Sequence, residues 1–192
     1  TKINFNHTKK LQYILSIFIS LIPLSMVIGA AIMEFFIIST CLLFFYLNFK
    51  KIGLIYYKNF FFIIFIIFCI FLIFSSTTSE NIFNSLRNTL FYFRFGIFSL
   101  CFWFLLERNK FLLRYLFISL LICFSSLILD GYVQYLFKKN LFGYPLYNEY
   151  RVSSFFGSEL ILGSYLSRFF PILFGLFVFF DQIKKNKLLL FF

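Results

Sequence analysis

The sequence predicts an all-α fold: a polytopic transmembrane helical bundle of about six spans, with the start of a seventh. Of its 192 residues, 61% are hydrophobic and only 13% are charged. A soluble domain of this length cannot bury so much apolar surface, whereas apolar runs of about 18 residues or more are typical of membrane spans. Short basic clusters separate these runs, which is the pattern that sets membrane topology. We therefore expect the chain to lie in a lipid bilayer.

The first two spans share one long apolar run. Residues 11–49 are apolar apart from Glu34, and at about 1.5 Å per residue one helix of that length would cover close to twice the hydrocarbon thickness of a bilayer. A break at residues 27–30 would give two helices in a tight hairpin, and Pro23 can bend the first of them. The preceding basic segment is not followed by a small-residue cleavage site, so we expect an uncleaved span rather than a signal peptide.

The later spans are shorter and better separated. The third is expected at residues 60–74, the fourth at about 90–106, and the fifth from the basic turn at residues 107–114 to residue 129. A loop at residues 130–158 then leads to a sixth span, which starts near Glu159 and ends before Lys184. Residues 187–192 look like the opening of a seventh span. We expect one membrane domain, residues 1–192, that is the N-terminal part of a longer protein.

The basic residues predict the orientation. With the N-terminus in the cytoplasm, 12 of the 18 Lys and Arg residues fall on the inside, and this excess agrees with the positive-inside rule. The inside residues are Lys2, Lys9, Lys10, Lys50, Lys51, Lys58, Arg108, Lys110, Arg114, Lys184, Lys185 and Lys187. The others are Arg87, Arg94, Lys138, Lys139, Arg151 and Arg168. Loop 130–158 is therefore expected on the outer side.

Two classes of function are disfavoured. A net charge of +11 could indicate nucleic-acid binding, but the basic residues flank the spans instead of forming a stripe on a soluble face, so no nucleic-acid partner is expected. Metal and redox sites need clustered ligands. The cysteines fall in separate apolar runs without a CxxC motif, so we expect no metal and no cofactor; they are Cys41, Cys69, Cys101 and Cys123.

Two arginines fall in or beside the fourth span. Arg87 and Arg94 are seven residues apart and so share one face of a helix. An arginine near the centre of a span costs roughly 2.5–3.5 kcal/mol on insertion scales, so it normally has a partner or lines a wet cavity. Two interpretations are open: Arg94 pairs with Glu34, or both arginines form an electropositive pocket that receives an anionic headgroup.

Arg151 is the first candidate for a ligand-binding residue. It follows a tyrosine-rich segment and precedes a Ser/Gly stretch, residues 153–158, that is expected to open a helix at Ser158. The guanidinium group offers a planar fork of donors suited to phosphate oxygens, and a helix start adds free backbone N–H groups. This combination predicts a phosphate-binding site.

Other polar residues surround this candidate. Asp130 and Gln134, four residues apart, are expected to share a helix face where they cap the span or form interfacial hydrogen bonds. Lys138 and Lys139 run against the inside rule, so they either contact phosphates or extend along the interface.

The sixth span carries its own pattern. Glu159 and Arg168 are nine residues apart and should lie on opposite faces of one helix. Gly163 and Ser167 have the small-xxx-small spacing that allows close helix packing, and Pro171 is expected to bend the span.

The segment DGYVQYLFKKNLFGYPLYNEYRVSSFFGSELILGSYLSRFFPIL resembles the O-antigen ligase and polymerase family of bacterial envelope glycosyltransferases. In that family a periplasmic loop carries an Arg just before an F-G-acidic stretch that enters the next span and ends at Pro. The matching positions here are Arg151, Phe156, Gly157, Glu159, Gly163, Leu166 and Pro171. The segment around Arg87 and Arg94 and the positions Asp130, Gly131 and Gln134 also look like this family.

The resemblance implies transfer of a glycan from undecaprenyl-diphosphate to lipid A–core, on the periplasmic side of the bacterial inner membrane. It implies that arginines hold the diphosphate, with Arg151 matching the first of them, and that no metal or nucleotide is needed. The family's His lies in a later periplasmic loop to which nothing here corresponds, so this chain alone is expected to be inactive. An O-antigen polymerase, a transporter or flippase for a lipid-linked sugar, and a non-catalytic membrane subunit are the alternatives.

Overall fold

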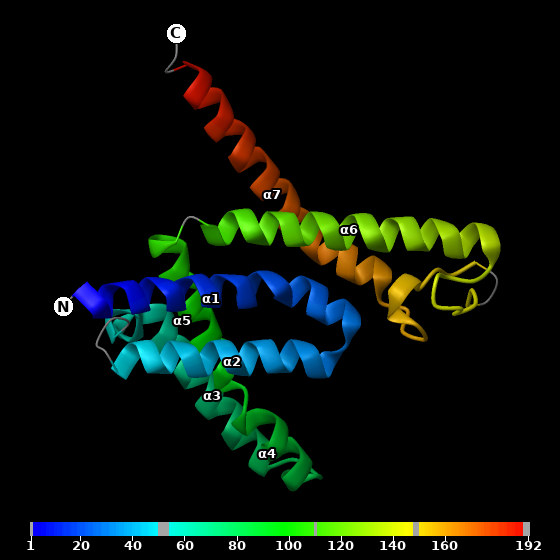
Figure 1. Ribbon diagram of the computed structural model, residues 1–192. Coiled ribbons are helices and arrows are strands. Elements are labelled where there is room, and N and C mark those ends of the chain that lie inside the picture. Colours follow the sequence, from blue (N-terminus) through cyan, green and yellow to red (C-terminus); the bar gives the residue numbers. More distant parts are fainter. Residues whose placement is uncertain (1, 50–53, 110, 148–149, 190–192) are drawn as a thin grey trace. The chain divides into compact units, whose positions relative to one another are not determined.

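The computed structural model describes residues 2–49, 54–109, 111–147 and 150–189, and these are almost entirely helical (Figure 1). The elements in chain order are α1 (Lys2–Ile28), α2 (Ala30–Phe49), η1 (Leu54–Lys58), α3 (Phe60–Thr77), α4 (Ile82–Leu90), α5 (Phe93–Arg108), α6 (Phe111–Phe137), η2 (Ser154–Phe156) and α7 (Leu162–Leu189). Six helical segments of the described chain are long and apolar enough to cross a membrane. The predicted class, an all-α multi-pass membrane protein, is confirmed.

The candidate spans fall close to the predicted ones. They are Thr8–Ile28, Ala30–Leu47, Phe60–Thr77, Ile82–Arg108, Phe111–Phe137 and Leu162–Asp181. The predicted break at residues 27–30 is confirmed, because only Gly29 separates α1 from α2. Gly29 has a φ of 156° and its N–H donates to the carbonyl of Ser25 at 3.0 Å, which closes the end of α1. Pro23 lies inside α1, whose helix continues through it.

Three predicted boundaries are wrong. The fourth span is divided into α4 and α5, with Phe91 and Tyr92 between them. The fifth continues past residue 129 to Phe137, because contacts from the following loop satisfy the polar groups of its last turns. The sixth begins at Leu162 and runs to Leu189, through the basic residues that were expected to follow it. Of the predicted seventh span, residues 190–192 lie outside the described residues.

The contacts divide the chain into two compact units, Thr1–Ile19 with Met33–Leu112 and Ser20–Ile32 with Leu113–Phe192. In the first unit, the rings of Phe44 and Phe104 are fully buried with their centroids 5.7 Å apart. Helices α3 and α4 form a hairpin joined by hydroxyl groups: Ser76 Oγ donates to Thr89 Oγ1 at 3.1 Å. Short polar side chains thus hold this pair where apolar burial is small.

Helix α5 packs closely on α3 through Gly96. A Cβ added at Gly96 would lie 2.3 Å from Cε1 of Phe65, a distance at which one of the two groups must move. The absence of a side chain at this position therefore permits the approach of the Phe65 ring. Sequence inspection singled out Gly163 as the close-packing glycine, but a Cβ there meets nothing within 4 Å of the described chain.

In the second unit, Tyr165 of α7 joins two other helices. Its hydroxyl donates to the carbonyl oxygen of Pro23 at 2.7 Å and lies 3.1 Å from Cys123 Sγ. Tyr165 and Cys123 are buried, as are Leu120 and Leu127 of α6. This contact places the last part of α1 against α6 and α7 within the unit that also holds loop 138–161.

Candidate functional site

The loop that follows α6 is built around the carboxamide of Gln134. This side chain is fully buried, and its Oε1 accepts hydrogen bonds from the backbone N–H groups of Ser153 (3.0 Å) and Ser154 (2.7 Å). Its Nε2 donates to the carbonyl of Pro145 at 3.1 Å. One side chain from the last turn of α6 therefore joins both arms of the loop.

Asp130, one turn earlier in α6, also holds the loop by side-chain hydrogen bonds, to Leu141 and Ser154. Its carboxylate is 1% exposed; Oδ1 accepts from the N–H of Leu141 at 3.0 Å and Oδ2 from Ser154 Oγ at 2.8 Å. The hydrogen-bonding interpretation of the Asp130–Gln134 pair agrees with this arrangement, although the partners belong to the loop rather than to the membrane interface. A buried carboxylate used in this way positions the loop and is not available to a ligand.

Asn140 completes the frame. Its Nδ2 donates to the carbonyl of Ser154 at 2.8 Å, and its Oδ1 accepts from the N–H groups of Phe142 (3.0 Å) and Tyr144 (2.7 Å). Gly143, at a φ of 87°, closes the turn. The sequence analysis did not single out Asn140, but an Asn three residues before a Gly is a recognisable turn signal.

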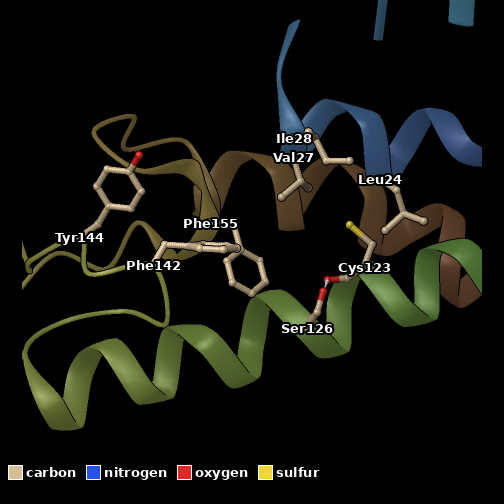
Figure 2. A pocket seen from close by; sticks show the side chains of 8 residues that line it. All are labelled: Leu24, Val27, Ile28, Cys123, Ser126, Phe142, Tyr144 and Phe155. Atoms are coloured by element: carbon tan, nitrogen blue, oxygen red, sulfur yellow. Dashed lines mark hydrogen bonds between the residues drawn. The ribbon is translucent and has the colours of Figure 1, made fainter. Parts of the chain in front are cut away.

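An apolar cavity of about 650 Å³ lies beside this loop (Figure 2). One wall comes from the end of α1, another from α6, and the loop supplies three aromatic rings. The lining residues are Leu24, Val27, Ile28, Cys123, Ser126, Phe142, Tyr144 and Phe155. A cavity of this size and lining suits a hydrocarbon chain or another apolar group.

Gly157 allows the Tyr144 ring to lie at the edge of the cavity. It has a φ of 63°, a left-handed conformation that favours glycine, and an added Cβ would lie 3.2 Å from Cζ of Tyr144. The Tyr144 ring thus packs directly on the Gly157 backbone at the edge of the cavity. Gly157, one of the positions that match the family pattern, belongs to the frame of the site for this reason.

Arg151 is exposed on the same loop. Its backbone pairs with Tyr147 in an isolated antiparallel bridge, with N···O distances of 2.9 and 3.1 Å. Within the described chain, its guanidinium has no hydrogen bond or ion pair to a side chain. The group is therefore free to bind an anion from outside the protein.

The helix start expected at Ser158 is wrong. Residues 154–156 form the short helix η2, and α7 begins only at Leu162. The N–H groups of Phe156 and Glu159 bond within the loop, to the carbonyls of Ser153 and Phe156. The loop bonds in this tight form because the buried side chains of α6 fix Ser153 and Ser154. The structure consequently does not join Arg151 to a helix N-terminus at Ser158.

Glu159 and Arg168 do not share a helix either. Glu159 precedes α7, whereas Arg168 lies within it, and both are exposed. Neither has an ion-pair partner among the described residues.

The arginines of the fourth span lie in the other unit. Arg94, in the first turn of α5, donates through Nη2 to Glu34 Oε1 of α2 at 2.6 Å, with the two side chains 27% and 30% exposed. This is the pair that one of the two interpretations anticipated. Arg87 of α4 is exposed and forms no ion pair with the described residues. Glu34 Oε2 and Arg94 Nε, both buried, have no partner in that part of the chain.

Chemically, the second unit offers two features on the same loop: the exposed guanidinium of Arg151 and rings that line an apolar cavity. Among the described residues, no three His, Cys, Asp or Glu side chains come together to hold a metal ion. No family model, curated protein or solved structure matches the chain. What the site can bind therefore has to be inferred from its own geometry and chemistry.

Proposed function

We propose that this chain is part of an O-antigen ligase-like membrane glycosyltransferase, which moves a glycan from undecaprenyl-diphosphate to lipid A–core at the periplasmic face of the bacterial inner membrane. The observation that carries the proposal is the combination, on one loop, of an exposed Arg151 that has no ion pair with the described residues and three aromatic residues that line an apolar cavity. A lipid-linked diphosphate has the same two parts, an anionic head and a hydrocarbon chain.

The loop suits such a donor because its described side-chain hydrogen bonds do not involve the Arg151 guanidinium. Buried Asp130 and Gln134 hold both arms, so the guanidinium does not serve the frame. A planar guanidinium can bind diphosphate oxygens through two parallel hydrogen bonds, and such charge-assisted bonds are stronger than neutral ones. In this proposal Arg151 binds the diphosphate while the cavity takes part of the isoprenoid chain.

The other candidate arginines have different expected roles. Arg94 already has a carboxylate partner 2.6 Å away, so its first role is to stabilise the first unit. Arg87 is exposed and remains a candidate anion-binding residue of the first unit. Glu159 and Arg168 are exposed near the start of α7 and are candidates for contacts with the sugar or the acceptor.

The test replaces Arg151 with Ala in the full-length gene and examines surface polysaccharide on a gel from the native host. The matched control is Arg114→Ala, an exposed arginine at the opposite end of α6. We expect R151A to lose most of the polysaccharide ladder while the lipid-linked precursor accumulates, and R114A to keep it. An unchanged ladder at normal protein level in R151A would remove Arg151 as a diphosphate ligand and contradict the proposal.

The same gel separates the two activities in the family. In a ligase mutant the chains disappear from lipid A–core. In a polymerase mutant they shorten to a single repeat. Both outcomes keep the loop as a site for a lipid-linked diphosphate and change only the acceptor.

One observation favours a transporter of lipid-linked sugar as the second candidate. The fourth candidate span, Ile82–Arg108, is interrupted at Phe91 and Tyr92, and Arg94 follows the interruption. Interrupted helices with charged residues near the break are typical of substrate pathways in transporters. Accumulation of the precursor on the cytoplasmic side, rather than on the periplasmic side, in the R151A mutant would favour this alternative.

A further inference from the structure

The tip of the loop after α6 carries two large apolar side chains that are mostly exposed. Leu141 is 69% exposed and Phe142 is 72% exposed, although Phe142 also packs on Phe155 with ring centroids 5.3 Å apart. Both residues lie outside the six candidate spans of the described chain, where an exposed apolar patch marks an interaction or membrane-contact site.

The exposure of these residues is built into the turn. Asn140 is 5% exposed and bonds through its side chain to three backbone groups, and the N–H of Leu141 is fixed by the Asp130 carboxylate. The polar side chain is thus buried, while Leu141 and Phe142 remain mostly exposed even though the Phe142 ring also lines the cavity of Figure 2. Because a folding preference alone would favour the opposite arrangement, an apolar phase outside the protein is expected to cover the tip.

The charged residues beside the tip indicate that this apolar phase is a lipid bilayer. Lys138 and Lys139 precede the tip and are exposed, and the Lys138 Nζ lies 5.4 Å from the centre of the Tyr135 ring. Asp130 is buried and already hydrogen-bonded, so its charge does not face the surface beside the lysines. Glu159, in the opposite arm of the loop, is the exposed acidic residue of the described loop. Apolar side chains beside lysines match a bilayer surface with anionic headgroups.

The end of α6 is continuous with this surface. Its last two turns expose four large residues, three of them aromatic, as expected where a span leaves the hydrocarbon region. They are Tyr132, Tyr135, Leu136 and Phe137. The loop tip follows this aromatic segment without any intervening soluble structure.

We propose that residues 138–142 form a membrane-interface anchor, in which Leu141 and Phe142 insert into the bilayer and Lys138 and Lys139 bind anionic phospholipid headgroups. The anchor fixes the height of the loop relative to the membrane surface. Phe142 also lines the cavity of Figure 2, so the anchor shares this one residue with the proposed isoprenoid site, whereas Leu141, Lys138 and Lys139 are not part of the cavity lining. Headgroup binding by the two lysines therefore does not depend on the glycosyltransferase function.

The test incorporates the photocrosslinking residue p-benzoylphenylalanine at position 142 of the full-length protein in liposomes. The liposomes contain equal amounts of zwitterionic phosphatidylcholine and anionic phosphatidylglycerol. Mass spectrometry of the irradiated protein then reports which molecule is attached. Phe71, an exposed residue in the middle of α3, is the reference position for bulk lipid.

We expect lipid adducts at position 142, with the anionic lipid enriched about fivefold over the ratio at position 71. The double variant K138Q/K139Q should return the ratio to the reference value. The matched double variant K10Q/K58Q, which removes two exposed lysines elsewhere, should leave the enrichment unchanged.

Two results would overturn the anchor. Adducts to protein segments, or no adduct at position 142 while position 71 labels lipid, would mean that protein or water covers the tip. Lipid adducts without anionic enrichment would refute headgroup binding by the lysines.

Discussion

A single buried carboxamide, that of Gln134, reaches segments of the chain up to 20 residues away. In the low-polarity environment at the end of a span, a backbone N–H without a partner costs about 1–3 kcal/mol. Gln134 and Asp130 remove that cost for the N–H groups of Ser153, Ser154 and Leu141. The loop that carries Arg151 consequently depends on two side chains of α6 as well as on its own Asn140.

Replacing Gln134 with Leu tests this dependence. Leucine retains similar volume but leaves two buried N–H groups unpaired, so the loop should be destabilised by roughly 2–4 kcal/mol. Proteolysis of a locally opened segment follows its opening equilibrium, and cleavage within residues 138–158 should be at least about 30-fold faster. Tyr132→Leu, an exposed change on the same helix, is the control. Equal cleavage rates in both variants would show that other contacts hold the loop.

The Glu34–Arg94 pair gives a second prediction at the scale of single residues. Each partner is mostly enclosed, so Glu34→Leu or Arg94→Leu leaves a poorly solvated charge and should cost roughly 1–3 kcal/mol, less than for a fully buried pair. The double variant should be more stable than either single variant, because no unpaired charge remains. Thermal unfolding of the four proteins in detergent gives the coupling energy. Additive effects would contradict a direct interaction.

At the scale of elements, the structure of the first unit depends on how closely α3 and α5 approach. Gly96 lies under the Phe65 ring, and Tyr92, just before α5, stacks on the same ring with centroids 6.3 Å apart. Helices in a bilayer associate through close packing rather than through exclusion of water. The small size of residue 96 therefore contributes more to the packing of α5 on α3 than its apolar character does.

Gly96→Ala tests the contact. The new Cβ would lie 2.3 Å from Phe65, so the helices must separate or the ring must move, at a cost of about 1–3 kcal/mol. Gly163→Ala in α7, where the Cβ meets nothing within 4 Å, should be neutral or slightly stabilising. Thermal unfolding in detergent compares the two. Recovery of stability by Phe65→Leu in the G96A background would identify the ring as the cause, and similar stability of G96A and wild type would refute the close contact.

The interruption between α4 and α5 has a local cause. The N–H groups of Tyr92, Arg94 and Phe95 bond to carbonyls three residues earlier, which tightens the chain at this point. Helix α4 is held by hydroxyl contacts to α3, while Arg94 is held by Glu34 of α2. Helix α3 thus holds α4 and helix α2 holds α5. These two contacts, together with the tightened turn, explain why one apolar run forms two helices.

At the scale of the whole molecule, topology is the property on which the proposed function depends. The charge distribution predicts that the N-terminus is cytoplasmic and that Arg151 lies on the opposite side of the membrane. The four native cysteines are buried, so an introduced cysteine can be labelled with little background.

Accessibility to a membrane-impermeant maleimide tests this orientation. Tyr150→Cys, at a side chain that is 79% exposed in the loop, should react in intact spheroplasts. Lys10→Cys, also exposed, should react only after permeabilisation. The reverse pattern would place the loop in the cytoplasm and contradict transfer on the periplasmic side.

The sequence by itself determined the membrane class, the six spans and the break at Gly29. These follow from local properties: the length of an apolar run, the residues that interrupt it and the basic residues beside it. Asp130, Gln134 and Arg151 could be selected in the same way, because polar residues next to a span are conspicuous. Asn140 also carries a local signal, because an Asn three residues before a Gly is a common turn pattern.

Only the tertiary structure decided what these residues do. It assigned Asp130, Gln134 and Asn140 to the loop frame, gave the Arg151 guanidinium no ion pair among the described residues, and paired Arg94 with Glu34. It also moved the start of α7 from Ser158 to Leu162 and identified Gly96 rather than Gly163 as the close contact. Each result depends on groups far apart in the chain. Their hydrogen bonds and steric contacts exist only once the helices have packed, so a local pattern does not determine them.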